Sequence, residues 1–208
     1  MMKTLIISIA SMATACAGEF VDLFNGKDFT GWGAPDKTER FGYVVEEGGV
    51  IASTPKCRFL ITAKEYENYV FAFEFKLTPG ANNGLGIHYP GKGDAAYAGM
   101  EIQMLDGTHK KYAGKLKDYQ YHGGLYTLKA AKQNHQKPVG EWNKQIVTVN
   151  GPKIKVELNG VVILEANLDE INKTHPKHNG AKRRKGHLAF CGHGDIVRMR
   201  NLKIKVLK

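Results

Sequence analysis

The segment Tyr69–Leu77 has the sequence YVFAFEFKL, and its alternation decides the fold class. Aromatic or aliphatic residues stand at every second position, and Val, Ala, Glu and Lys stand between them. Because successive side chains of a β-strand point to opposite faces, this spacing predicts a strand with one fully buried face. An amphipathic helix would instead repeat its apolar positions every three or four residues.

A second alternating segment, residues 153–159, ends in the pair Asn159-Gly160. This pair readily adopts the positive φ angles of a two-residue hairpin turn, so a hairpin to residues 161–165 is predicted. Shorter strands are predicted at residues 20–23, 43–45, 50–53, 59–62, 85–89, 100–105, 145–149, 187–190 and 197–206.

The strand at residues 197–206 changes the phase of its alternation, and a β-bulge near Arg200-Asn201 would explain the change. Residues 168–173 could form one or two helical turns, but no long helical pattern is present. Many short strands joined by Gly-rich turns predict an all-β fold, a jelly-roll sandwich of two antiparallel sheets.

The beginning of the chain predicts export. Lys3, the apolar run of residues 5–10 and the triplet Ala15-Cys16-Ala17 have the form of a signal peptide that is cleaved before Gly18. Residues 1–17 would then be removed, and residues 18–208 would form a single sandwich domain. The apolar run is too short for a membrane-spanning helix. The protein is predicted to be periplasmic or secreted; the alternative is a surface lipoprotein with a lipid anchor at Cys16.

The chain is basic, with 30 Lys and Arg against 20 Asp and Glu residues in 208. Nucleic acid is the usual partner of such a chain, but an export signal argues against it. The densest basic run, residues 182–185 (KRRK), is expected to be a solvated loop. Cys57 and Cys191 remain after the leader, and the sequence leaves open whether they form a disulfide or stay as two buried thiols. The oligomeric state is also open.

The segment of residues 100–106 (MEIQMLD) holds the first candidate site residues. If Ile102 and Met104 face the core, Glu101 and Gln103 face the opposite, open side of the sheet. A carboxylate in the middle of a strand needs a partner or a function, although an ordinary surface glutamate is the alternative. Residues Glu101, Gln103 and Asp106 resemble the E-x-D-x-x-E strand of sandwich-fold laminarinases. Because the middle acid is an amide here, the double displacement of those glucanases is not supported.

Two histidines are further candidates. His88 stands in an apolar strand segment (NGLGIHY), where a structural role is the alternative to a catalytic one. His193 stands between Gly192 and Gly194 at a strand end (CGHGD), where glycines let a ligand approach the backbone. The alternative for His193 is an exposed residue of a Gly-rich turn. Neither spacing forms a metal motif.

Aromatic residues could stack on a sugar ring, and Trp32, Tyr89 and Tyr126 are the candidates. Core packing is the alternative fate of all three. Trp142, within the segment GEWN, is assigned to a structural role.

The chain resembles the 3-keto-disaccharide hydrolase domain family along nearly its whole mature length. The matching segments are residues 20–32 (FVDLFNGKDFTGW), 66–77, 81–84 (ANNG), 100–106, 124–126 (GLY), 138–143 (PVGEWN), 158–161 (LNGV) and 187–205 (HLAFCGHGDIVRMRNLKIK). Residues 91–97 and the basic loop 174–185 have no counterpart in the family pattern.

The resemblance implies a concanavalin A-like sandwich and activity on sugars oxidised at C3. It also implies site positions, which are Glu101, Gln103, Tyr126, His193 and Arg200.

The expected reaction is removal of the C2 proton, elimination of the C1 group and addition of water. His193 is expected to act as base or acid with Glu101 as its partner, and His88 is a reserve base. No cofactor is expected, but a bound divalent cation stays open, with Asp94, Asp106 and Asp195 as candidate ligands. The alternative functions are a lectin-like carbohydrate-binding module and a cell-wall scaffold protein that would use the basic loop.

Overall fold

The computed structural model describes residues 18–34 and 42–208. The predicted signal peptide, residues 1–17, lies outside the described residues, and so does Cys16. Among the residues that are described, no helix is both long and apolar enough to cross a membrane.

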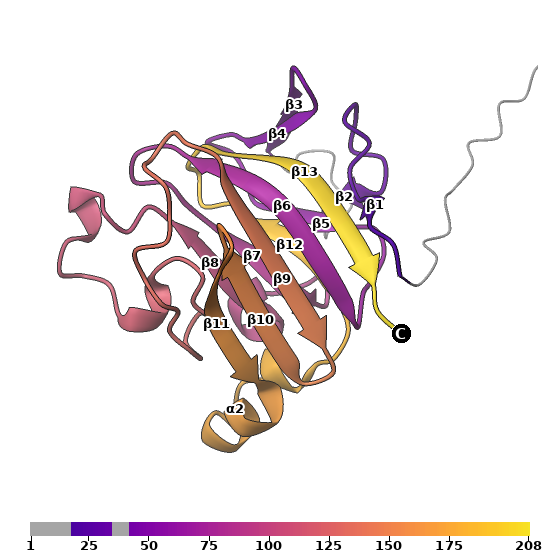
Figure 1. The fold of residues 1–208 in the computed structure, drawn as a ribbon, viewed down its shortest axis with the longest axis vertical. Coiled ribbons are helices and arrows are strands. Elements are labelled where there is room, and N and C mark those ends of the chain that lie inside the picture. The colour runs from indigo at the N-terminus through magenta and orange to yellow at the C-terminus, as the bar shows by residue number, and fades with distance from the viewer. Residues whose placement is uncertain (1–17, 35–41) are drawn as a thin grey trace, which may run out of the picture.

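The fold is an all-β sandwich of two antiparallel sheets, as predicted (Figure 1). The larger sheet has the strand order β11-β10-β9-β6-β13-β4-β3, and β1 pairs with β13 beside this path. Its strands are β1 (Val21–Asp22), β3 (Tyr43–Glu46), β4 (Val50–Ser53), β6 (Tyr69–Leu77), β9 (Asn143–Asn150), β10 (Lys153–Leu158), β11 (Val161–Asn167) and β13 (Val197–Val206).

The smaller sheet has the order β2-β5-β12-β7-β8 and lies behind the larger one in the view of Figure 1. Its strands are β2 (Trp32–Gly33), β5 (Phe59–Thr62), β7 (Asn82–Tyr89), β8 (Met100–Leu105) and β12 (His187–Cys191). The short helices are α1 (Ala95–Ala98), α2 (Leu168–Thr174) and the 3-10 turns η1 (Lys110–Tyr112), η2 (Asp118–Gln120) and η3 (Gly180–Lys182). The strand β2 and the helix α1 were not predicted from the sequence.

Strand β6 carries the middle of the core, as its alternation predicts. Tyr69, Phe71, Phe73 and Phe75 all face the smaller sheet and are at most 1% exposed. Burying each such side chain contributes roughly 1.5–3 kcal/mol. The ring of Phe73 meets that of Phe190 on β12 edge to face, with centroids 5.7 Å apart, so the two sheets are joined through aromatic contacts.

Two backbone predictions are confirmed. Asn159 and Gly160 have φ angles of 51° and 88°, as the hairpin between β10 and β11 requires. The pairing of β13 with β6 shifts register between Arg200 and Lys203, and Asn201 has a φ of 54°, so a bulge is present where the alternation changes phase.

The two questions on cysteines and charge also have structural answers. Cys57 and Cys191 are buried free thiols, so they form no disulfide here.

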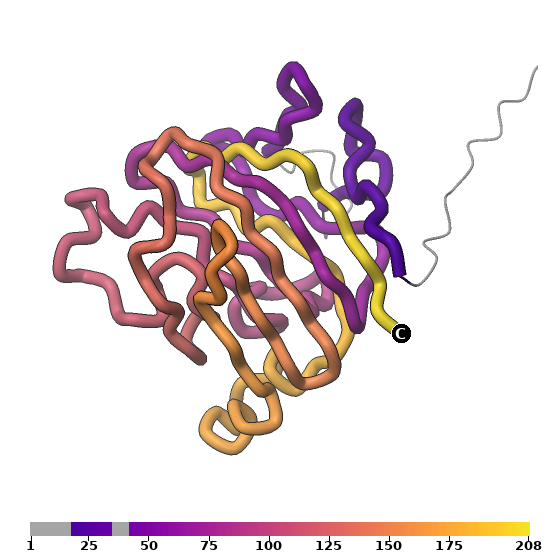
Figure 2. Tube along the Cα trace, viewed as in Figure 1, coloured from indigo at the N-terminus to yellow at the C-terminus, as the bar shows by residue number. Residues whose placement is uncertain are grey.

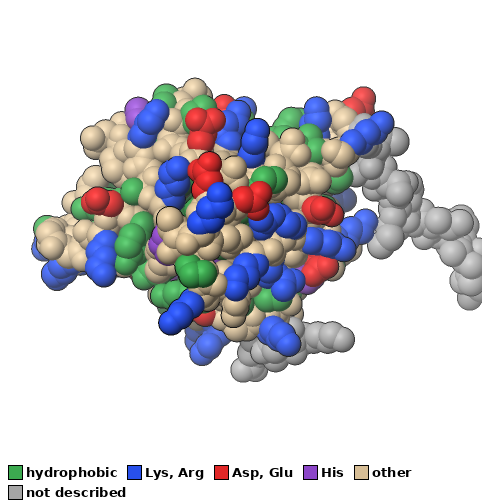
Figure 3. All heavy atoms as spheres, turned by 90° about the horizontal axis from the view of Figure 1, so that it is seen from below, with side chains coloured by type: hydrophobic (Ala, Val, Ile, Leu, Met, Phe, Trp, Pro, Cys, Tyr) green, Lys and Arg blue, Asp and Glu red, His purple; other side chains and the backbone are tan. Residues whose placement is uncertain are grey.

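In the basic run, Arg184 pairs with Asp169 at 2.6 Å and Lys185 with Glu65 at 3.5 Å. Figure 3 shows acidic side chains interspersed among the Lys and Arg side chains on the face seen from below. These observations fit a solvated loop rather than a continuous basic patch.

The long connection between β8 and β9 decides what covers the smaller sheet. Figure 2 shows its first part projecting from the sandwich and then turning back along it. Its returning segment, residues 123–126, runs beside β8, which is the last strand of its sheet.

Candidate functional site

Strand β8 presents its two faces as predicted. Ile102 and Met104 are fully buried in the core, and Glu101 and Gln103 point to the other face of the smaller sheet. The prediction that this face is open is wrong, however, because Glu101 is only 6% exposed and Gln103 only 5%.

The cover over β8 comes from residues 123–126, which bond to the free edge of the strand. Gly123 N donates to Gln103 O at 2.8 Å, and Gln103 N donates to Gly124 O at 2.9 Å. Tyr126 N donates to Glu101 O at 2.9 Å, so the backbone of Tyr126 is fixed next to that of Glu101. Because its edge is already paired, β8 is protected from pairing with another chain. Its outward side chains, Glu101 and Gln103, lie on the floor of the candidate site.

The carboxylate of Glu101 lies over Gly84 of β7. A Cβ atom at position 84 would overlap Oε1 of Glu101, so only glycine leaves room for the carboxylate here. Oε1 is shielded from solvent and has no hydrogen-bond partner among the described residues. A buried carboxylate oxygen without a partner is costly, which indicates that it is kept for a ligand or for proton transfer.

His193 reaches Glu101 from the turn between β12 and β13. Gly192 N donates to Arg58 O at 2.6 Å, and Gly194 N donates to the Sγ of Cys57 at 3.3 Å. Gly194 has a φ of 87°, which a residue with a side chain rarely adopts. The two glycines thus hold the turn against the segment before β5 and present the imidazole between them.

His193 and Glu101 form the central pair of the site. Nε2 of His193 lies 3.6 Å from Oε1 of Glu101, slightly longer than a hydrogen bond. The side chain of His193 is 48% exposed, and that of Glu101 is 7% exposed. The pKa of His193 is raised, chiefly by interaction with Glu101, and Asp94 and Asp195 add to the effect. The pair therefore holds its proton to a higher pH than a free histidine would and is open to solvent on the side of the histidine.

Gln103 begins a chain of polar contacts along one side of the pair. Its Nε2 donates to Oδ1 of Asn82 at 3.0 Å, and Asn82 N donates to Oδ2 of Asp195 at 3.0 Å. Nζ of Lys111 lies 3.5 Å from the same Asp195 oxygen. This network fixes the amide of Gln103 beside the carboxylate of Glu101.

Tyr126 lies on another side of the pair and carries a polar hydroxyl. Its hydroxyl oxygen accepts a hydrogen bond from Nε2 of Gln120 at 3.2 Å, so its own O–H remains to be donated. Its ring meets that of Tyr119 at 5.7 Å, nearly perpendicular. Tyr119 was not predicted from the sequence, because a tyrosine in a long loop gives no periodic signal.

The structure thus brings together four of the predicted residues, which are Glu101, Gln103, Tyr126 and His193. His88 is not among them. It is fully buried on β7 with a φ of 50°, at the point where the pairing with β12 shifts register. Burial lowers the pKa of His88 to about 4, which does not suit a base near neutral pH.

Arg200 lies on the outer face of the larger sheet, away from the pair. Its Nε contacts Oε2 of Glu74 at 2.6 Å, and its guanidinium lies 4.0 Å from the ring centre of Trp142. The resemblance placed Arg200 at the substrate, but the alternation of β13 buries Val197 and Met199 and turns Arg200 outward. Trp142 is structural, as predicted.

The two remaining aromatic candidates are packed inside the fold. Trp32 is 8% exposed, stacks on Phe190 and donates from Nε1 to Leu23 O at 2.8 Å. Tyr89 is 1% exposed, stacks on Phe59 and donates from its hydroxyl to Gly93 O at 2.8 Å. Neither ring offers a free face to a sugar.

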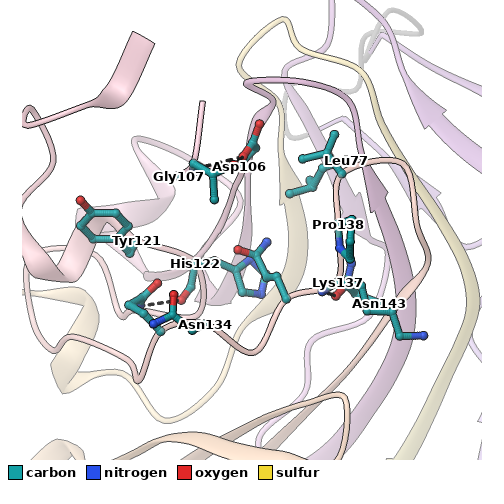
Figure 4. Close-up of a pocket in the computed structure, with 13 residues that line it drawn as sticks. Leu77, Asp106, Gly107, Tyr121, His122, Asn134, Lys137, Pro138 and Asn143 are labelled. Carbon is teal, nitrogen blue, oxygen red and sulfur yellow. Dashed lines mark hydrogen bonds between the residues drawn. The ribbon is translucent and has the colours of Figure 1, made fainter. Parts of the chain in front are cut away.

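Asp106 lies in a different region of the molecule from the Glu101–His193 pair. Its side chain belongs to a cavity of about 430 Å³ at the end of β8, where Figure 4 shows His122 between Tyr121 and the Lys137–Pro138 segment. Asp106 accepts hydrogen bonds from Gly80 N, Thr108 N and Thr108 Oγ1. Since its oxygens are satisfied by the fold, this carboxylate is less suited to chemistry than Glu101.

In the described part of the chain, no group of three or more His, Cys, Asp or Glu side chains is arranged to hold a metal ion. The candidate ligands Asp94, Asp106 and Asp195 do not gather at one point. Asp94 caps α1 through Ala96 N at 2.9 Å, and Asp195 bonds to Asn82.

Comparison with known proteins finds relatives of known structure or assigned activity. A curated 3-keto-disaccharide hydrolase of Bacteroides thetaiotaomicron is 25% identical over 232 residues, which cover 92% of this chain and 79% of that protein. Two solved structures of candidate glycosyl hydrolases from Parabacteroides distasonis are 26% and 28% identical, each with a TM-score of 0.78. The matches cover 91% of this chain and 94% and 100% of theirs.

A carbohydrate-binding module of Bacillus subtilis shares the fold alone, with a TM-score of 0.55 and 12% identity over 85% of this chain and 96% of that chain. The model of one sequence family matches residues 19–205, which is nearly the whole of the described chain. The chain belongs to the family of 3-keto-alpha-glucoside-1,2-lyase-like domains.

Proposed function

We propose that this chain is an exported enzyme that cleaves 3-keto-glycosides by elimination followed by hydration. The observation that carries the proposal is the shielded Oε1 of Glu101, which has no hydrogen bond within the described residues and lies 3.6 Å from Nε2 of the half-exposed imidazole of His193. Membership of the family and the name of the Bacteroides relative support the choice of a keto sugar as substrate.

The chemistry follows from the ketone at C3. This carbonyl acidifies the C2 proton, and the C1 substituent lies β to it. When the C2–H bond breaks, its electron pair forms an enolate. Collapse of the enolate forms the C1=C2 bond and expels the C1 group, which takes up a proton and leaves as an alcohol. Water then adds its hydroxyl to C1 and its hydrogen to C2, so the net reaction is hydrolysis.

The Glu101–His193 pair would supply the proton transfers. Because interaction with Glu101 raises the pKa of His193, the imidazolium form persists to a higher pH than in a free histidine. The carboxylate of Glu101 can then accept the C2 proton, while the imidazolium donates a proton to the leaving oxygen. The O–H of Tyr126 is free to stabilise the enolate oxygen, and Gln103 would bind sugar hydroxyls.

A conventional two-carboxylate glycosidase mechanism has less support. Asp106 would be the second carboxylate, but it lies beyond the end of β8 and its oxygens accept hydrogen bonds from Gly80 and Thr108. Retaining glycosidases need both carboxyl groups at one bond, about 5–5.5 Å apart.

A lectin-like module is the second candidate, since the fold is shared with a carbohydrate-binding module. A lectin has no need of a buried carboxylate paired with histidine. If the protein only binds sugar, Glu101→Gln would keep the affinity of the wild type.

The test is incubation of the mature protein, residues 18–208, with a 3-keto-glucoside and with its unoxidised parent in D₂O. We expect release of the C1 group from the keto compound alone, with deuterium incorporated at C2 of the product. His193→Ala should abolish release, and His135→Ala in a distant loop should not. Cleavage of the parent compound would support a conventional glycosidase, and cleavage of neither compound would support the lectin.

Export is tested separately. The chain with its leader is produced in a bacterial host, and the mass of the mature protein is measured. A mass that begins at Gly18 supports signal peptidase cleavage, and a lipid-modified Cys16 supports the lipoprotein alternative.

A further inference from the structure

Two segments of the chain pack against each other. One is α1, and the other is the basic loop of residues 174–185. Nε2 of His178 contacts Ala96 O at 2.9 Å, and Ala181 N donates to Nδ1 of the same ring at 3.1 Å. Since Nδ1 accepts, Nε2 carries the hydrogen, and the neutral ring joins α1 to the loop.

The contact between these segments is close along the backbone as well. A Cβ atom at position 180 would overlap the carbonyl oxygen of Gly99, the residue that ends α1. The loop therefore acts as a fixed support for the helix.

Helix α1 lies next to Glu101 on the outer face of the smaller sheet. Gly86 of β7 pairs with Glu101, and a Cβ at Gly86 would lie 3.4 Å from the Cβ of Ala95. The carboxylate of Glu101 covers Gly84, the next outward position on the same strand. Two outward positions of one strand are about 7 Å apart, so the helix and the carboxylate are neighbours.

Tyr97 is the exposed residue of α1, with 52% of its surface accessible. Its ring lies 6.1 Å from the ring of His178. Together with residues 174–178 it lines a hollow of about 470 Å³, whose lining atoms are mostly apolar. The pKa of Tyr97 is raised, first by partial burial and then by Tyr126, Asp94, Tyr119 and Glu101, which agrees with a position at the rim of the site.

We propose that Tyr97 and residues 174–178 bind the leaving group of the keto-glycoside and favour a planar aromatic group over a second sugar. An aromatic aglycone can stack on Tyr97 and fill the apolar hollow. The hydroxyls of a second pyranose would find few hydrogen-bond partners among the lining atoms of the hollow, which are mostly apolar. This inference rests on the proposed function of the Glu101–His193 pair and assigns its substrate class.

The experiment compares two substrates of the mature protein, 4-nitrophenyl 3-keto-glucoside and a 3-keto-disaccharide. For each, kcat/KM is measured in the wild type, Tyr97→Ala and Tyr97→Phe. The ratio of the aryl to the disaccharide value should fall roughly five- to tenfold in Tyr97→Ala, since an aromatic contact is lost. Tyr97→Phe keeps the ring and should keep the ratio. Val161→Ala, an exposed apolar position on β11, is the matched control and should change neither value.

A second measurement separates this inference from the proposed function. Saturation-transfer NMR with unoxidised 4-nitrophenyl glucoside should show contact of the nitrophenyl ring with the wild type and loss of contact in Tyr97→Ala. If neither keto substrate is cleaved but the ring contact is present, the proposed function fails and the aryl site stands. If cleavage occurs but the ratio is the same in Tyr97→Ala, or the ring contact is absent, the aryl site is overturned.

Discussion

The two ends of β8 each bring a carboxylate near a histidine, and the two regions differ in how far the protein satisfies them. At Glu101, one carboxylate oxygen is shielded and has no hydrogen-bond partner among the described residues, and His193 is half exposed. In the region of Asp106, the carboxylate accepts three hydrogen bonds, and His122 is buried against the ring of Phe75 at 4.9 Å.

This difference supports the proposal that the Glu101 region, rather than the Asp106 region, binds the substrate. Hydrogen bonds to Gly80 and Thr108 use the acceptor capacity of Asp106 to hold two turns in place. Oε1 of Glu101 keeps its acceptor capacity, because its contact with His193 is longer than a hydrogen bond. A cavity alone would have favoured the other region, because the hollow of about 430 Å³ is lined by Asp106 and not by Glu101.

The largest expected effect is on catalysis. Glu101→Gln removes the proton acceptor with little change of shape, and kcat should fall by about 10²–10⁴-fold. Asp106→Asn at the other end of β8 should keep kcat within a few-fold of the wild type. The measurement is steady-state cleavage of a 3-keto-glucoside, with thermal unfolding to show that both variants fold.

Equal losses of kcat in Glu101→Gln and Asp106→Asn would contradict the proposal that catalysis depends on the Glu101 region and not on the Asp106 region. Full activity of Glu101→Gln would remove the carboxylate from the mechanism and leave His193 as the only titrating group of the pair.

The next effect comes from Gly84, which makes room for the carboxylate. In Gly84→Ala the new methyl group would force the side chain of Glu101 away from its position, so kcat should fall at least about tenfold although no catalytic atom is changed. Gly33→Ala on β2 is the matched control, because a Cβ at position 33 meets no atom within 4 Å. A wild-type kcat in Gly84→Ala would show that the position of the carboxylate over Gly84 is not needed.

The faces of β8 were predictable, whereas the surroundings of the site were not. Strict alternation in residues 100–105 separates Glu101 and Gln103 from Ile102 and Met104, and two glycines indicate that His193 is presented to a ligand. Alternation alone says nothing about which loop covers an edge strand. The pairing of residues 123–126 with the edge of β8 therefore needed the structure.

Arg200 and Trp32 are two further residues whose surroundings could not be predicted from the sequence. The bulge at Arg200 was predictable from the change of phase, but the sequence does not say that the arginine faces Glu74 on the outer face of the larger sheet. Trp32 was a candidate for stacking on a sugar, but it forms the short strand β2 and packs into the core. Tyr97 gave no signal, because the four-residue helix that carries it is too short to show a period.

A smaller effect is expected on stability in the Asp106 region. Asp106→Ala removes acceptors from Gly80 N and from Thr108, and the free energy of unfolding should fall by about 1–3 kcal/mol. Burial acts to raise the pKa of Asp106, but hydrogen bonds from Thr108 and Gly80 outweigh it, and the pKa is lowered. The stabilisation by the ionised group is thus present above its unfolded pKa of about 3.9 and is lost as the pH falls through the folded value.

Urea unfolding at pH 7 and at pH 2.5 measures this effect. The difference between the wild type and Asp106→Ala should shrink at the lower pH, because the stabilisation by the ionised group is lost as the pH falls towards the lowered folded pKa of Asp106. Glu101→Gln should show a smaller loss at pH 7, because its shielded oxygen has no protein hydrogen bond to lose and its contact with the half-exposed His193 is 3.6 Å long. An unchanged difference at the two pH values would mean that Asp106 stabilises the fold by packing rather than by charge.

The smallest effect, and the most direct comparison of the regions, is the titration of the two histidines. The pKa of His193 is raised by Glu101, whereas burial lowers the pKa of His122 to about 4. NMR should therefore show His193 titrating above its ordinary value of about 6.5, and His122 staying neutral down to pH 5. A raised pKa means that the charged pair stabilises the fold below about pH 6.5 and stops doing so as the pH rises through the folded value. In Glu101→Gln the pKa of His193 should return to its ordinary value or below it, while His122 should not change. If His193 keeps its raised pKa without the carboxylate, Asp94 and Asp195 hold its proton, and Glu101 is then a substrate-binding group rather than its partner.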